Sequence, residues 1–186
     1  MDSPFLTTFA GALGAHGVRV ARFEFPYMAG RRVDGKKRGP DRPPVLLDAW
    51  ARVIDVLGPA DRLVIGGKSM GGRIASMAAA TASDSGVPVA GVVCLGYPFH
   101  PPGKPEKLRT EHLKALQTPM LVVQGSRDPF GTCDQVAEYD LSSHIHFLWL
   151  EDGDHDLKPR KKSGRTQDQN WQQAIAGIAE FVAELG

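Results

Sequence analysis

The stretch VIGGKSMGGR, residues 64–73, joins an apolar run to a glycine-rich turn and admits two functional interpretations. A phosphate-binding loop requires the pattern G-x-x-x-x-G-K-[ST], in which a wide turn of backbone N–H groups surrounds the phosphates. Gly67, Lys68 and Ser69 match the end of that pattern, but Arg62 occupies the position of its first glycine. Residues 63–65 are Leu-Val-Ile, which is typical of a buried strand and not of a loop. The spacing therefore argues against a nucleotide-binding loop.

The same stretch fits the pattern G-x-S-x-G, in which a serine lies on a sharp turn between a strand and a helix. Gly67 and Gly71 flank Ser69, and a Cβ atom at either position is expected to collide as the chain doubles back. Gly72 leaves room for close packing of the next helix. The alternative is a glycine-rich turn that carries an ordinary serine. The strand-like residues before the motif and the helical pattern after it favour a nucleophilic Ser69.

The composition favours a cytoplasmic protein that needs no cross-links. A chain of 186 residues is long enough for a single domain, residues 1–186, that buries about 70% of its unfolded surface. Cys94 lies in an apolar run and Cys133 in a predicted turn, so both are expected to be free thiols. The formal net charge of +1 gives no general attraction to nucleic acid or to anionic membranes. No apolar run approaches the roughly 20 residues of a membrane span.

No residues have the spacing of metal ligands, so the sequence predicts neither a metal nor a cofactor. The expected partner is a small-molecule substrate, with no nucleic acid and no membrane. The sequence does not determine the oligomeric state.

Strand-like and helix-like patterns alternate along the chain. Ser3 and Pro4 are typical of a helix start, and this first helix is expected to end at Gly17. Further helices are predicted for residues 45–57 and 73–82, and for a last segment with the apolar stripe Trp171, Ile175, Ile178 and Val182. Strands are predicted for residues 18–25, 63–66, 89–95, 120–124 and 145–150, and a long loop for residues 27–44. This alternation predicts a mostly parallel central sheet with helices on both faces, whose ligands bind at the carboxyl ends of the strands.

Two groups of residues are candidate substrate contacts. Tyr97, Phe99 and Phe130 suit a modest apolar acyl group, although aromatic residues near strand ends are also commonly core residues. The long predicted loop is basic, and its charges either recognise an anionic group or are simply solvated; they are Arg31, Arg32, Lys36, Lys37, Arg38 and Arg42.

A serine nucleophile needs an imidazole base, and that base should follow a strand end because the loops converge there. Of the six histidines, only His155 follows the end of a predicted strand, in the sequence LEDGDHDLKP. The others lie elsewhere in the predicted order of elements: His16, His100, His112, His144 and His146. The alternative is a surface histidine among acidic residues.

The imidazole in turn needs a carboxylate to orient it, and Asp128 in QGSRDPFG lies just beyond another strand end. Asp152, Asp154 and Asp156 are nearer to His155 in sequence, but adjacent residues rarely present a carboxylate and a ring to each other correctly. We therefore favour Asp128 over these three.

Four stretches, GGKSMGGR, GYPFHPPGKP, QGSRDPFG and EDGDHDLKP, together resemble the small bacterial α/β-hydrolases of the dienelactone-hydrolase-like group. Within that group the chain is similar to the testis-expressed and NSL-complex-subunit type of hydrolase-like proteins, over essentially its whole length. The resemblance implies an α/β-hydrolase fold with Ser69 as nucleophile, Asp128 as orienting acid and His155 as base. It implies no particular substrate.

These residues predict a serine hydrolase that acts on a carboxylic ester or thioester through an acyl-enzyme, with the Met70 N–H binding the oxyanion. A non-catalytic interaction module that keeps the same fold is the alternative.

The resemblance also implies that a strand and a loop precede the helix at Ser3. That strand would lie between residues 18–25 and 63–66, so the chain as given apparently lacks N-terminal strands and Met1 is expected to be an internal methionine. A minimal variant with a closed sheet is the alternative.

Overall fold

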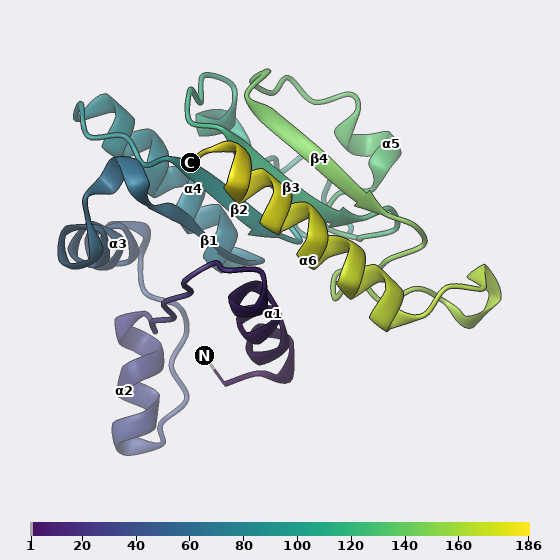
Figure 1. Cartoon of the computed structure of the whole chain (residues 1–186), viewed down its shortest axis with the longest axis horizontal. Coiled ribbons are helices and arrows are strands. Elements are labelled where there is room, and N and C mark those ends of the chain that lie inside the picture. The colour runs from purple at the N-terminus through teal and green to yellow at the C-terminus, as the bar shows by residue number, and fades with distance from the viewer. Residues whose placement is uncertain (1) are drawn as a thin grey trace.

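The computed structural model describes residues 2–186, which form a parallel sheet covered by helices on both faces (Figure 1). The four strands are β1 (Val64–Lys68), β2 (Gly91–Leu95), β3 (Met120–Gly125) and β4 (Ile145–Leu150). The helices are α1 (Pro4–Ala15), α2 (Pro26–Asp34), α3 (Pro43–Leu57), α4 (Met70–Asp84), the short α5 (Cys133–Val136) and α6 (Gln167–Glu184). Three 3₁₀ turns complete the elements: η1 (Ala60–Arg62), η2 (Glu111–Leu113) and η3 (Lys161–Ser163).

The strands lie in sequence order, β1-β2-β3-β4, and each neighbouring pair is parallel. All the strands therefore end at the same edge of the sheet, where loops that are distant in sequence meet. β2 and β3 are buried along their whole length, which explains their nearly unbroken apolar sequences.

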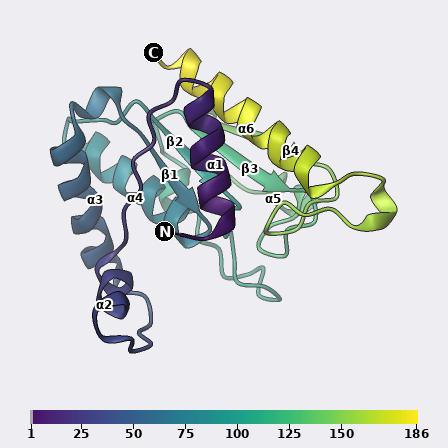
Figure 2. The ribbon, with the colours of Figure 1, turned by 60° about the horizontal axis from the view of Figure 1, so that its bottom comes forward.

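Two hydrophobic clusters hold the helices against the sheet. On one face, α3 and α4 pack against strand residues such as Ile65, Val92 and Val122. On the other face, α1 and α6 pack against residues such as Leu121 and Val123 (Figure 2). Neighbouring residues of a strand point to opposite faces of the sheet and so enter different clusters. The sheet and its two helical layers form a three-layer α/β/α arrangement.

The predicted first strand, residues 18–25, is wrong. This segment forms neither a helix nor a strand, and within the described residues β1 pairs with β2 alone. Phe23 packs against Phe25 and Trp50, with its ring centroid 4.7 Å from that of Trp50. The alternation of polar and apolar residues thus reflects packing on α3 and not a place in the sheet.

The predicted long loop, residues 27–44, is also largely wrong, because it contains α2 and the start of α3. Pro26 occupies the first helical position and Gly35 ends the helix in a left-handed conformation, with φ of 69°. The basic and glycine-rich composition of this segment concealed these two helix signals.

The remaining differences are smaller. α4 begins at Met70, immediately after Ser69, and not at residue 73. The first helix begins as predicted, because the Ser3 side chain accepts a hydrogen bond from the Leu6 N–H. The strands predicted at 120–124 and 145–150 agree with β3 and β4 to within one residue.

Candidate active site

Ser69 lies on a strained turn between β1 and α4. Its φ is 54° and its ψ is −121°, a conformation that costs a non-glycine residue about 1–3 kcal/mol. The Ser69 N–H donates to the Leu95 carbonyl over 2.9 Å, and the Ser69 carbonyl accepts from the Arg73 N–H over 3.1 Å. β2 and the first turn of α4 therefore hold the serine in this conformation.

The glycines around Ser69 allow the strand and the helix to approach closely. A Cβ atom on Gly67 would lie 2.8 Å from the carbonyl carbon of Gly71, and one on Gly72 would lie 2.6 Å from the Gly67 oxygen. The steric requirement predicted for Gly67 is confirmed, as is the need for space at Gly72. The requirement predicted for Gly71 is wrong, because a Cβ atom there would meet nothing within 4 Å.

His155 reaches Ser69 from the loop that follows β4, which we call the base loop (residues 151–157). Its Nε2 atom lies 2.9 Å from Ser69 Oγ. The ring packs against Phe130, with a centroid separation of 4.3 Å, and against Gly96 at the end of β2. These neighbours hold the ring across the carboxyl end of the sheet, while 21% of the side chain stays exposed.

Asp128 reaches the opposite side of the same imidazole. Its Oδ2 atom lies 2.8 Å from His155 Nδ1 and also accepts a hydrogen bond from Gln124 Nε2 over 3.0 Å. Its Oδ1 atom accepts from the Phe130 N–H over 2.9 Å. The carboxylate is completely buried, and these donors compensate the cost of removing it from water. An ionised Asp128 accepts from Nδ1–H, which leaves Nε2 free to accept the Ser69 proton.

The three alternative carboxylates bind elsewhere. Asp152 is held by Arg127 and Arg160. Asp154 Oδ1 accepts hydrogen bonds from the backbone N–H groups of Asp156 and Lys158. Asp156 forms an ion pair of 2.7 Å with Lys68 Nζ, which also donates to the His155 carbonyl over 3.3 Å. Lys68 therefore lies against the base loop.

Of the other histidines, His112 makes a second contact between an imidazole and a hydroxyl. Its Nε2 atom lies 2.8 Å from Ser76 Oγ, on the side of α4 that faces η2. Burial, with a smaller contribution from the positive charge of Arg73, lowers the pKa of His112 to about 4. Ser76 is completely buried, so this pair fastens η2 to α4.

The candidate substrate contacts occupy two different environments. Tyr97 and Phe99 are completely buried in the core, where the Tyr97 hydroxyl donates to the Arg109 carbonyl over 2.8 Å. This burial fits the alternative, in which Tyr97 and Phe99 are core residues, and we do not propose that they contact substrate. Phe130 is half-buried against His155 and retains the predicted location beside the site.

The basic residues of the predicted long loop lie in and after α2. Arg32 pairs with Asp2 and Glu24, and Arg38 pairs with Asp34. For Arg32 and Arg38, these surface pairs favour the alternative of solvated charges.

Sequence reasoning missed Gln124 as a member of this site. Its side-chain amide links the Tyr97 backbone to Asp128, because it accepts from the Tyr97 N–H over 2.7 Å and donates to Asp128. The available signal was a polar residue at the end of an otherwise apolar run, Met120–Gly125.

Two further properties concern metals and membranes. No group of three or more His, Cys, Asp or Glu side chains within residues 2–186 is arranged to hold a metal ion. Across the same described range, each helix is too short or too polar to span a bilayer.

Comparison with known proteins agrees with this architecture. Residues 1–183 match a family described as an alpha/beta hydrolase domain. The esterase domain of a Rhodothermus marinus protein superposes with a TM-score of 0.61 at 18% identity, over 98% of this chain and 80% of that one. An alpha-beta serine hydrolase homologue from Coxiella burnetii gives a TM-score of 0.60 at 21% identity, over 99% and 76%.

A dienelactone-hydrolase-like promiscuous phosphotriesterase from metagenomic libraries gives a TM-score of 0.50 at 15% identity, over 85% of this chain and 65% of that one. At these identities the structural similarities establish the fold alone, whereas the family match covers nearly the whole sequence. The chain thus has an α/β-hydrolase fold and belongs to the alpha/beta hydrolase domain family.

Proposed function

We propose that this protein is a serine hydrolase that cleaves a carboxylic ester or thioester of a small molecule through an acyl-enzyme on Ser69. The observation that carries the proposal is the unbroken chain of contacts from Ser69 Oγ to His155 Nε2 (2.9 Å) and from His155 Nδ1 to Asp128 Oδ2 (2.8 Å). A serine, an imidazole and a buried carboxylate in this order are what nucleophilic acyl transfer requires.

In the first step, Ser69 Oγ attacks the carbonyl carbon while its proton passes to His155 Nε2. The new positive charge on the imidazole is stabilised by the Asp128 carboxylate, which also accepts hydrogen bonds from the Gln124 side chain and the Phe130 N–H. The same two donors fix the orientation of the carboxylate, so the ring keeps the tautomer that the reaction needs.

The oxyanion that forms in this step needs hydrogen-bond donors. The Met70 N–H lies at the first position of α4, ahead of the first helical hydrogen bond, which Arg73 donates to the Ser69 carbonyl. N–H groups in the first turn of a helix have no partner within the helix, and the helix dipole favours negative charge there. We assign the Met70 N–H as one oxyanion donor.

Collapse of the tetrahedral intermediate breaks the bond to the alcohol or thiol, which takes the proton from His155 Nε2. A water molecule then attacks the acyl-Ser69 carbonyl, again losing its proton to His155. The second collapse releases the acid and returns the proton to Ser69 Oγ, so the enzyme is regenerated.

The substrate class follows from the surroundings of the site and from similar proteins. Phe130 offers an apolar contact beside His155, which suits a modest acyl group. One structurally similar protein is an esterase domain, which is consistent with ester cleavage. By its four sequence motifs we assign the protein to the small dienelactone-hydrolase-like group, and we propose that it acts in the cytoplasm.

A fluorophosphonate probe tests the proposal because it reacts only with an activated serine. We expect labelling of the wild-type protein at Ser69 and none of Ser69→Ala. Ser85→Ala is the matched control, since it removes an exposed hydroxyl from the other end of α4 and should leave labelling unchanged. Absence of labelling in a folded wild-type sample would refute the proposal and favour the non-catalytic interaction module.

A further inference from the structure

The base loop contains two non-glycine residues in the left-handed region. Asp152 has φ of 52° and Leu157 has φ of 64°, and His155 lies between them. Each such residue costs about 1–3 kcal/mol and persists only where its surroundings impose the conformation. The contacts that impose these two conformations on the base loop therefore also hold His155 in place.

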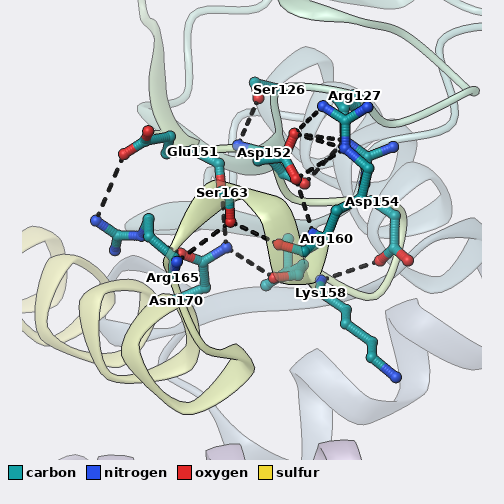
Figure 3. A network of polar contacts seen from close by, with 11 residues as sticks. Ser126, Arg127, Glu151, Asp152, Asp154, Lys158, Arg160, Ser163, Arg165 and Asn170 are labelled. Carbon is teal, nitrogen blue, oxygen red and sulfur yellow. Dashed lines mark hydrogen bonds and ion pairs between the residues drawn. The ribbon is translucent and has the colours of Figure 1, made fainter.

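Asp152 makes several of these contacts, with Ser126, Arg127 and Arg160 (Figure 3). Its Oδ2 atom accepts from the Arg160 N–H over 2.7 Å, and its two carboxylate oxygens accept from Arg160 Nε over 2.9 and 3.0 Å. Arg127 Nε lies 3.0 Å from Asp152 Oδ1. The side chain is only 11% exposed, and hydrogen bonds from Arg160 hold the pKa of the Asp152 carboxyl far below its usual value.

The backbone of Asp152 also contacts Arg127, and it contacts Ser126 as well. Arg127 Nε donates to the Asp152 carbonyl over 3.0 Å, and the Asp152 N–H donates to Ser126 Oγ over 2.9 Å. The Arg127 N–H donates to the Gly153 carbonyl over 3.0 Å. Ser126 and Arg127 directly precede Asp128, so these contacts join the base loop to the loop that carries the acid.

The distance between those two loops decides whether His155 Nδ1 meets Asp128 Oδ2. Arg127 binds Asp152 to the loop that carries Asp128. Arg160 binds Asp152 to the segment that follows the base loop. A carboxylate between two guanidinium groups makes charge-assisted hydrogen bonds, which are stronger and more directional than neutral ones. An amide in its place would keep the shape and lose the charge.

We propose that Asp152 is a positioning residue, which holds His155 in hydrogen-bonding contact with both Asp128 and Ser69 by linking Arg127 to Arg160. The role in turnover rests on the proposed hydrolase function. Asp152 touches no reacting atom, and its effect on turnover passes through the orientation of the imidazole.

Asp152→Asn in the full chain tests this role. With an activated ester we expect kcat to fall about tenfold at unchanged KM, because the substrate site is intact while the base is displaced. The rate of fluorophosphonate labelling should fall by the same factor. Arg127→Gln should give a similar loss, and the double variant should lose little more, since both changes break one link.

Glu151→Gln is the matched control. The substitution removes an exposed carboxylate from the same loop. Within residues 2–186, the only ion pair of the Glu151 carboxylate is a contact of 3.8 Å with Arg165. We expect wild-type kcat, KM and labelling for this variant. A melting temperature measured for every variant separates loss of folded protein from loss of turnover per folded molecule.

A readout independent of activity is the proton resonance of His155 Nδ1–H in ¹⁵N-histidine-labelled protein. Held against Asp128, this proton should give a low-field signal that His155→Gln removes and that Asp152→Asn broadens or loses. This signal decides the positioning role even if the wild-type protein fails to label, which would refute only the proposed function. If Asp152→Asn keeps both the signal and the wild-type kcat, Asp152 is not a positioning residue.

Discussion

Gly125→Ala should displace the base loop and lower turnover without unfolding the protein. Gly125 is the last residue of β3, and a Cβ atom there would lie 2.4 Å from the carbonyl oxygens of both Gly153 and Asp154. Real Cβ atoms essentially never approach closer than 3.0 Å, so the strand and the loop must separate by at least 0.6 Å. The atoms in the way belong to the backbone, which cannot rotate aside as a side chain can.

We expect the base loop to move and β3 to stay in place, because β3 is paired with β2 on one side and with β4 on the other. The base loop carries His155, whose contacts with Ser69 Oγ and Asp128 Oδ2 are 2.9 and 2.8 Å long. A shift of this size along either contact stretches it to about 3.5 Å, the limit of a hydrogen bond. Since a displacement of about 1 Å costs on the order of 100-fold in rate, we expect kcat to fall about 10- to 100-fold.

The assay is hydrolysis of a p-nitrophenyl ester, with thermal unfolding measured in parallel. Gly11→Ala is the control because its Cβ would meet nothing within 4 Å; Gly11 lies in the middle of α1. It should keep wild-type kcat and gain about 0.5–1 kcal/mol of stability from the helix propensity of alanine. A folded Gly125→Ala variant with wild-type kcat would show that contact with the end of β3 does not set the position of His155.

Three further predictions test the site and its surroundings. His155→Ala should lower turnover of an activated ester at least about 10³-fold, whereas the exposed His146→Ala should change it little; equal losses would remove His155 from the role of base. Asp128→Asn should leave the melting temperature nearly unchanged and lower kcat about 10³- to 10⁴-fold by favouring the wrong imidazole tautomer, and a wild-type rate would exclude this acid. His112 has a folded pKa of about 4, so between that pH and its ordinary value near 6.5 the unfolded chain binds the extra proton and stability falls as the pH falls. Urea unfolding of wild type and His112→Gln across this range should show a weaker pH dependence for the variant, and parallel curves would mean that His112 does not contribute.

The strands could be predicted from the sequence mainly where both faces of the strand are covered. β2 and β3, which are buried along their whole length, occupy nearly continuous apolar runs, which few other environments require. Residues 18–25 show the limit of the method, because Phe23 and Phe25 alternate with charged residues as a half-buried strand would. Only the tertiary structure reveals that these rings pack on Trp50 of α3 and that the segment has no neighbour to pair with.

The meeting of Ser69, Asp128 and His155 could be predicted because each follows the end of a strand, and parallel strands end at one edge of a sheet. Their catalytic roles stay a prediction until activity is measured. The link through Asp152 could not be predicted, since Arg127 and Asp152 are far apart in sequence and both resemble ordinary surface residues there. The burial of Tyr97 and Phe99 was equally hidden, because a strand end can face either the core or the site.

Ser69 and His155 are held in place by different kinds of contact, and these differ in how well they tolerate substitutions nearby. Ser69 is fixed by regular structure, since β2 accepts its N–H and α4 begins at the next residue. His155 lies on a loop without regular hydrogen bonding, and its position depends on contacts of side chains with backbone, such as those of Asp152 and of Lys68. Substitutions outside the triad should therefore lower turnover mainly by displacing the base and not the nucleophile. In such variants, labelling of Ser69 and ester turnover should decline together while the fold remains intact, because both reactions require His155 to accept the serine proton.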